Sequence, residues 1–104
     1  MSVIPACDDA PMTHLAFAEY VRRLSAAAFD VGIKCPSFRS PPKHPDVART
    51  VVRRPGGVVV AVRLRDRPAW SVRADMRAGV LAANRLDPDG PEAAAFAERL
   101  EHDQ

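Results

Sequence analysis

Long apolar runs are absent from this chain of 104 residues, and aromatic residues make up only 6% of it. No run approaches the ~20 apolar residues that a membrane-spanning helix needs. The first eleven residues, MSVIPACDDAP, lack the basic start and the apolar run of a secretory signal, and Asp8 and Asp9 interrupt them. We therefore expect a cytoplasmic protein with no membrane association.

Cysteine, glycine and histidine are also scarce. The two cysteines, Cys7 and Cys35, have no partners at metal-ligand spacing, so neither a disulfide framework nor a zinc site is predicted. The five glycines form no phosphate-binding loop, and the three histidines are scattered along the chain. The sequence thus predicts no metal and no cofactor.

The sequence also shows no convincing set of catalytic residues. Cys35, His44 and Asp46 share one proline-rich segment, but a nucleophilic triad is defined by its geometry in space and not by closeness in sequence. An activated thiol also needs an electropositive environment that a sequence does not reveal. We therefore predict a protein that is not an enzyme.

Charge, in contrast, is abundant and unevenly distributed. Residues 34–86 hold twelve basic residues and three acids, a net charge of +9, whereas residues 87–104 hold six acids and one arginine, a net charge of −5. The whole chain carries only +2. Such asymmetry is typical of proteins that bind nucleic acid or another charged partner.

The first regular element is expected directly after Met12. Apolar residues recur at intervals of three and four from Leu15 to Val31, which predicts a helix with one buried stripe. Thr13 is a suitable N-cap and Gly32 a suitable terminator. Residues 1–12 are expected to be a disordered lead, so that translation can start at Met1 or at Met12.

Residues 34–46 contain four prolines. Proline is excluded from helix interiors and central strands, so this segment is predicted to form an extended loop. Such a segment most often serves as a rigid connector, although proline-rich stretches also bind aromatic-lined grooves.

Two β-branched runs, at about 47–54 and 58–65, flank Pro55-Gly56-Gly57 and predict an antiparallel hairpin. A three-residue loop at these positions is one solution. A two-residue turn at Pro55-Gly56 slips the register by one residue, and the sequence leaves both open. Val58–Val60 is expected at an exposed edge, where it invites pairing between two copies of the chain.

The three-residue loop places Arg54 opposite Val58 and Arg49 opposite Arg63. Like charges directly opposite each other destabilise a strand pair unless an anion lies between them or both side chains extend into solvent. This arrangement indicates a binding surface on the hairpin, which the next helix extends. The polyanion-binding residues that we expect are Arg49, Arg53, Arg54, Arg63, Arg65, Arg73 and Arg77.

Residues 68–86 return to a helical period. Gly79 lies beside the apolar stripe, where it allows a neighbouring element to approach closely. Trp70, at the start of this segment, is expected to be a buried corner of the core. A last helix is predicted over about 91–102.

The predicted order is helix, two-stranded antiparallel hairpin, helix and short C-terminal helix, which is an α+β fold. Residues 13–86 are expected to form a single domain, and residues 87–104 an acidic linker and helix. A two-stranded sheet is marginal in isolation, so the hairpin needs helices on its apolar face or a second copy of the molecule.

These features favour a small protein that contacts nucleic acid or another polyanion through the arginine-rich hairpin face. Contacts to phosphate should dominate, because the chain matches no nucleic-acid-binding motif and has few aromatic residues for base stacking. If the acidic C-terminal segment folds over the basic face, it competes with a polyanion for that face. The alternative is a protein–protein interaction module, an adaptor or regulator, homodimeric through the hairpin edge.

Overall fold

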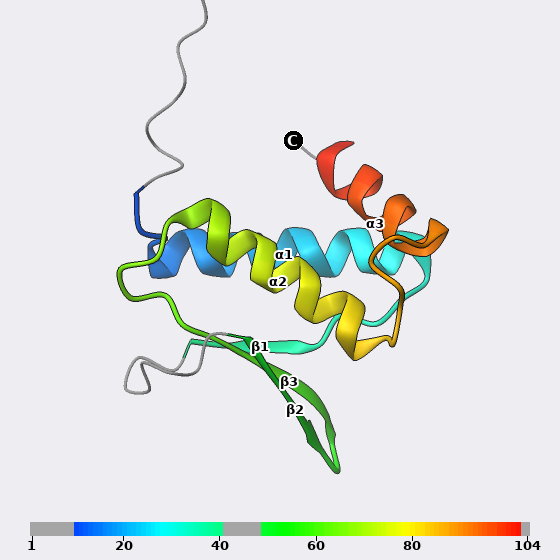
Figure 1. Cartoon of the computed structure of the whole chain (residues 1–104), viewed down its shortest axis with the longest axis horizontal. Coiled ribbons are helices and arrows are strands. Elements are labelled where there is room, and N and C mark those ends of the chain that lie inside the picture. The colour runs from blue at the N-terminus through cyan, green and yellow to red at the C-terminus, as the bar shows by residue number, and fades with distance from the viewer. Residues whose placement is uncertain (1–9, 41–48, 103–104) are drawn as a thin grey trace, which may run out of the picture.

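The computed structural model describes residues 10–40 and 49–102. Within them the chain forms α1 (His14–Val31), β1 (Ser37–Arg39), β2 (Arg49–Arg54), β3 (Gly57–Val62), α2 (Ala69–Ala83) and α3 (Pro91–His102). The strands form one sheet in the order β1-β3-β2, in which β1 is parallel and β2 antiparallel to β3. The helices lie to one side of this sheet (Figure 1). The prediction of an α+β fold is confirmed.

The first helix, α1, has the predicted caps. The Thr13 hydroxyl accepts a hydrogen bond from the Ala16 N–H at 3.0 Å, and Gly32 ends the helix in the left-handed conformation with φ of 78°. Phe17 and Leu24 lie on the buried stripe. This helix is therefore specified locally by its sequence and is then fixed by packing.

Ordered structure extends to the N-terminal side of α1. Met12 is buried in the core, and Pro11 forms an isolated β-bridge with Pro68. The N–H of Ala69 donates to the Ala10 carbonyl at 2.8 Å. The packed chain thus begins before Thr13, while the rest of the predicted lead, residues 1–9, lies outside the described residues.

A third strand, β1, lies inside the segment that was predicted to be an extended loop. Ser37–Arg39 pairs with Val59–Ala61 in parallel. Proline bars helix and central strand at its own position, but the three residues after Pro36 keep their N–H groups and can pair along one side. The prediction of a two-stranded hairpin is therefore incomplete, and the remainder of the proline-rich segment, residues 41–46, lies outside the described residues.

The hairpin has the register of a two-residue turn. Arg49 pairs with Val62 and Arg54 pairs with Gly57, so Pro55-Gly56 alone forms the turn. Gly57 has a φ of 144°, a conformation that side-chain-bearing residues rarely adopt. The register with a three-residue loop is therefore wrong, and the one that lies a single residue away is correct.

This register also corrects the expected pair of arginines. Arg49 does not lie opposite Arg63, and no repulsion between these two positions needs an anion to relieve it. Val51 pairs with Val60 and packs against the core, whereas Val52 lies on the opposite face of β2. Because β2 carries one valine on each face, its own hydrophobic pattern does not distinguish the two registers.

β3 is the central strand of the sheet. It pairs with β1 on one side and with β2 on the other, so the segment Val58–Val60 is not at an edge. The prediction of an exposed edge there is wrong, because β1 occupies it. The edges of the described sheet are β1 and β2.

α3 packs against α1 and completes the core. Ala93, Phe96 and Leu100 are buried on its inner face. Arg99 donates from Nε to the Asp30 carboxylate at 2.7 Å, which joins the exposed sides of the two helices. The acidic C-terminal helix is thus docked on α1.

Trp70 is 53% exposed, so the prediction of a buried corner is wrong. The buried stripe of α2 runs through Val72, Met76 and Val80. Trp70 lies two positions before Val72, which is about 200° around the helix and therefore on the other side.

α2 packs on the sheet at Gly79. A Cβ atom at this glycine would lie 2.8 Å from Cγ1 of Val60, closer than real Cβ contacts come. Val60 is 1% exposed and β-branched, so it has little freedom to move away. The prediction that Gly79 permits a close approach is confirmed, and its partner is the central strand.

Replacing Gly79 with Ala should lower the free energy of unfolding by about 1 kcal/mol, because overpacking of 1–3 kcal/mol outweighs the gain of about 1 kcal/mol in helix propensity. Urea denaturation measures the change. In a Val60→Ala background the obstructing methyl groups are gone, so the same substitution should there be neutral or stabilising. An equal loss in both backgrounds would show that Val60 is not the obstacle.

Candidate functional site

One face of the sheet is turned away from the helices. Val60 and Val62 are buried against them, so the residues that alternate with these valines, and their partners on β1 and β2, face the other way. We call this surface the open sheet face. It is formed by Ser37, Arg39, Thr50, Val52, Arg54, Val59 and Ala61.

The open sheet face is basic and carries hydroxyl groups. Every charged residue in the three strands is an arginine. Arg39 and Arg54 are exposed on this face, and Ser37 and Thr50 are exposed beside them. Phe38, the one aromatic residue in the strands, pairs with Val60 and so belongs to the other face. This face can bind anionic groups but offers no aromatic ring for base stacking.

The spacing of its arginines suits an extended ligand. Arg39 is in the row of Ala61 and Arg54 is in the row of Gly57, on strands that flank β3 on opposite sides. Four residues along a strand and two strand spacings across the sheet separate their Cα atoms by roughly 16 Å. Two arginines whose Cα atoms are that far apart are able to contact different phosphates of a polymer.

The arginines predicted on the hairpin do not share one face. Arg53 pairs with Val58 on the helix side of the sheet, although it is exposed near the turn. The backbone of Arg49 pairs with that of Val62, at the end of the hairpin away from the turn. Arg65 lies beyond the end of β3, 80% exposed, with its Nε 3.7 Å from the Asp66 carboxylate.

Of the predicted hairpin residues, Arg54 lies on the open sheet face and Arg63 follows β3. Arg63 is half-buried and alternates with the buried Val62 and Leu64, so it extends the same face. Arg39 joins these two from β1. The sequence did not indicate Arg39 as a site residue, because β1 was not expected and only tertiary pairing brings it beside β3.

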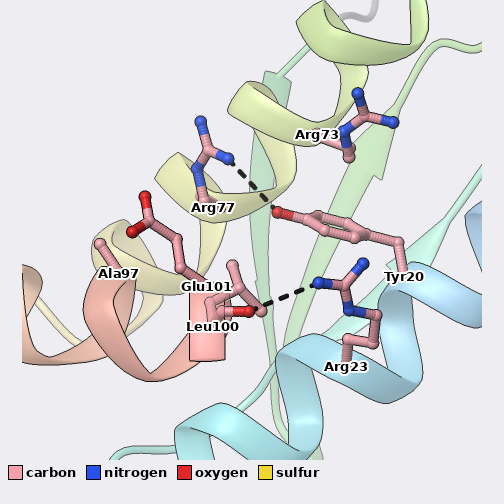
Figure 2. Close-up of a pocket in the computed structure, with 7 residues that line it drawn as sticks. All are labelled: Tyr20, Arg23, Arg73, Arg77, Ala97, Leu100 and Glu101. Carbon is pink, nitrogen blue, oxygen red and sulfur yellow. Dashed lines mark hydrogen bonds between the residues drawn. The ribbon is translucent and has the colours of Figure 1, made fainter. Parts of the chain in front are cut away.

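The remaining predicted residues, Arg73 and Arg77, lie on α2 in a different place. They line a cavity of about 640 Å³ among the three helices, which we call the helical groove. Figure 2 shows Tyr20 between the guanidinium groups that surround it. The residues that line the groove are Tyr20, Arg23, Arg73, Arg77, Ala97, Leu100 and Glu101.

Arg77 and Arg23 make polar contacts across the groove. Arg77 donates from Nη1 to the Tyr20 hydroxyl at 3.4 Å, and Arg23 donates from Nη2 to the Leu100 carbonyl at 3.4 Å. The Arg23 guanidinium also lies 5.8 Å from the centre of the Tyr20 ring, within cation–π range. Tyr20 and Arg23 appear in the sequence only as members of a helix, and tertiary packing is what combines them with α2.

The acidic C-terminal helix meets the arginines of α2 and not those of the hairpin. Glu101 of α3 lines the groove together with Arg73 and Arg77. α3 packs on α1, which lies on the helix side of the sheet (Figure 1). Any competition by this segment for basic residues is thus directed at the groove.

Arg67 has a structural role, because its guanidinium group contacts side chains of α2. It forms an ion pair with Asp75, and it donates to the Ser71 hydroxyl. Asp75 is the buried acid of the described chain, with 7% of its surface exposed. This pair joins the connection after β3 to the first turns of α2. Removing either partner would leave the other as a buried, uncompensated charge, which is destabilising.

Among the described residues, Cys35 does not have the surroundings of an activated nucleophile. It is half-buried, and burial raises the pKa of its thiol above the ordinary value, while a hydrogen bond from the Ser25 hydroxyl at 3.4 Å acts in the opposite direction. His44 and Asp46, its neighbours in sequence, lie outside the described residues. A thiol with a raised pKa is mostly protonated at neutral pH and reacts slowly.

Cys35 in a Cys7→Ser variant should therefore react with iodoacetamide more slowly than an unfolded cysteine at pH 7–8, and its rate should keep rising above pH 9. The same variant unfolded in urea provides the reference rate. Mass spectrometry of the alkylated protein gives both time courses. A folded-state rate above the unfolded one would indicate an activated thiol.

Two kinds of feature are absent from the part of the chain that the structure describes. No group of three or more His, Cys, Asp or Glu side chains is arranged to hold a metal ion. Within the same residues, no helix combines the length and the apolar character needed to cross a membrane.

Comparisons of the chain with protein-family models, with curated proteins and with solved structures found no match. The arguments for function therefore rest on the open sheet face and the helical groove.

Proposed function

We propose that this protein binds nucleic acid through the open sheet face, by contacts to the phosphate backbone. The observation that carries the proposal is the segregation of charge on the sheet. The charged residues of its three strands are all arginines, and the helices lie on its other side. A polyanion that approaches the sheet therefore meets cations from the strands and no carboxylate from them.

The chemistry of the face suits phosphate. Arg39 and Arg54 supply guanidinium donors, and Ser37 and Thr50 supply hydroxyl donors between them. Arginine and hydroxyl side chains are common partners of phosphate oxygens, and such contacts fix position without reading sequence. We therefore expect the affinity for nucleic acid to vary little with base sequence and to fall steeply as the salt concentration rises.

The first test is the affinity for labelled double-stranded and single-stranded DNA and RNA at about 50 and 200 mM salt. Replacing both Arg39 and Arg54 with Gln should weaken binding and reduce the slope of log K against log salt by about 2, since each lost phosphate contact removes about 1. The weakening should be similar for different base sequences.

A matched control removes two exposed arginines from the helical side, Arg22 and Arg85. The Arg22→Gln/Arg85→Gln variant has the same net charge as the sheet variant. It should keep its salt slope within about half a unit of the unmodified protein. Equal effects of the two variants would mean that net charge alone, and not the sheet, determines binding.

A protein partner is the second candidate, favoured by the apolar residues at the centre of the open sheet face. Val52, Val59 and Ala61 are half-buried there, between the arginines. A partner held by this apolar centre would bind with little dependence on salt. Absence of nucleic-acid binding at low salt would favour this candidate over the first.

A further inference from the structure

The helical groove is a second basic site, separate from the open sheet face. Three arginines from two helices line it against one acid, Glu101. Arg23 and Arg77 form no ion pair with any carboxylate in the described chain. Guanidinium groups brought together repel one another, and an anion placed among them relieves that repulsion.

The groove also holds hydrogen-bond donors that lack acceptors. The Nε–H of Arg23 is buried and has no partner among the described residues. Leaving a buried donor without an acceptor is unfavourable, so a ligand that supplied an acceptor would be stabilised here. The Tyr20 hydroxyl accepts from Arg77, which leaves its own proton for an acceptor in the groove.

The size and surroundings of the groove select a compact ligand. Its volume of about 640 Å³ lies in the range of small-molecule pockets. Glu101 on one wall, and Glu19 in the adjoining pocket that shares Tyr20, Arg23 and Arg73, place acids at its borders. An extended polyanion would meet both carboxylates, whereas a small anion held by the arginines meets only Glu101.

From these observations we infer that the helical groove binds the phosphate group of a small phosphorylated molecule, through Arg23, Arg73, Arg77 and the Tyr20 hydroxyl. A phosphate monoester has three terminal oxygens and a charge near −2 at neutral pH, which matches several guanidinium donors better than the two oxygens of a carboxylate. Apolar side chains lie on both sides for the organic part of the ligand: Ala97 and Leu100 in the groove, and Met12 and Ala16 in the adjoining pocket.

The test is a titration of the full chain, at constant ionic strength, with inorganic phosphate, adenosine monophosphate, adenosine and acetate. NMR resonances of Tyr20, Ala97 and Leu100 should shift saturably with the two phosphate compounds. Adenosine should have no effect, and acetate should bind at least about tenfold more weakly than phosphate, because it offers less charge and fewer acceptors.

Two variants test whether the phosphate lies beside Arg77 and Glu101 in the helical groove. Arg77→Gln should weaken phosphate binding about tenfold or more, since a charge-assisted hydrogen bond to the phosphate is lost. Glu101→Gln should strengthen it, because a repelling carboxylate is removed. Both residues are exposed, so the variants should fold, which circular dichroism checks.

Controls separate this site from the open sheet face. Arg22→Gln changes an exposed arginine next to Arg23 on α1 but outside the groove, and it should leave phosphate binding unchanged. The Arg39→Gln/Arg54→Gln variant should also bind phosphate normally, whether or not it binds nucleic acid. No saturable shift with either phosphate compound would overturn the inference. It would also be overturned if Arg77→Gln and Arg22→Gln had the same effect.

Discussion

The contact between Gly79 and Val60 determines how closely α2 lies on the central strand, and much of the fold depends on it. β3 is the central strand of the sheet, and its apolar residues Val60 and Val62 are buried. Because the neighbouring strands cover only its two edges, a helix has to cover the face that carries these valines. A side chain at position 79 would force α2 away from that face. The buried residues of α2 and of α1 belong to the same core cluster as Val60.

The same layering separates the charges of the molecule. Once the helices cover one face of the sheet, Arg39 and Arg54 are left on the other face, and Arg53 is exposed near the hairpin turn. Arg23 of α1 and Arg73 and Arg77 of α2 line the helical groove together with residues of α3. Two basic surfaces of different shape result: a flat one, whose arginines are far apart, and a concave one, whose arginines converge.

Capping residues and apolar spacing, which act over a few neighbouring residues, predicted the helices well. They did not predict the pairing between segments that are distant in the sequence. Thr13, Gly32 and the apolar spacing of α1 act within a few residues, so the sequence reveals them directly. The register of β2 was not decidable, because Val51 and Val52 put one valine on each face. β1 is too short to show a pattern, and Arg39 and Arg23 acquire their places only through contacts that a linear sequence does not contain.

The docking of α3 on α1 gives the molecule an electrical polarity. The strands carry only arginines among their charged residues, while α3 on the far side of α1 carries Glu92, Glu98 and Glu101 against Arg99. A body with separated charges experiences a torque in an external field. In front of any large anionic surface, the protein should therefore rotate during diffusion so that its sheet leads and α3 trails. Productive orientation then begins before contact, and added salt, which shortens the reach of the field, removes that advantage.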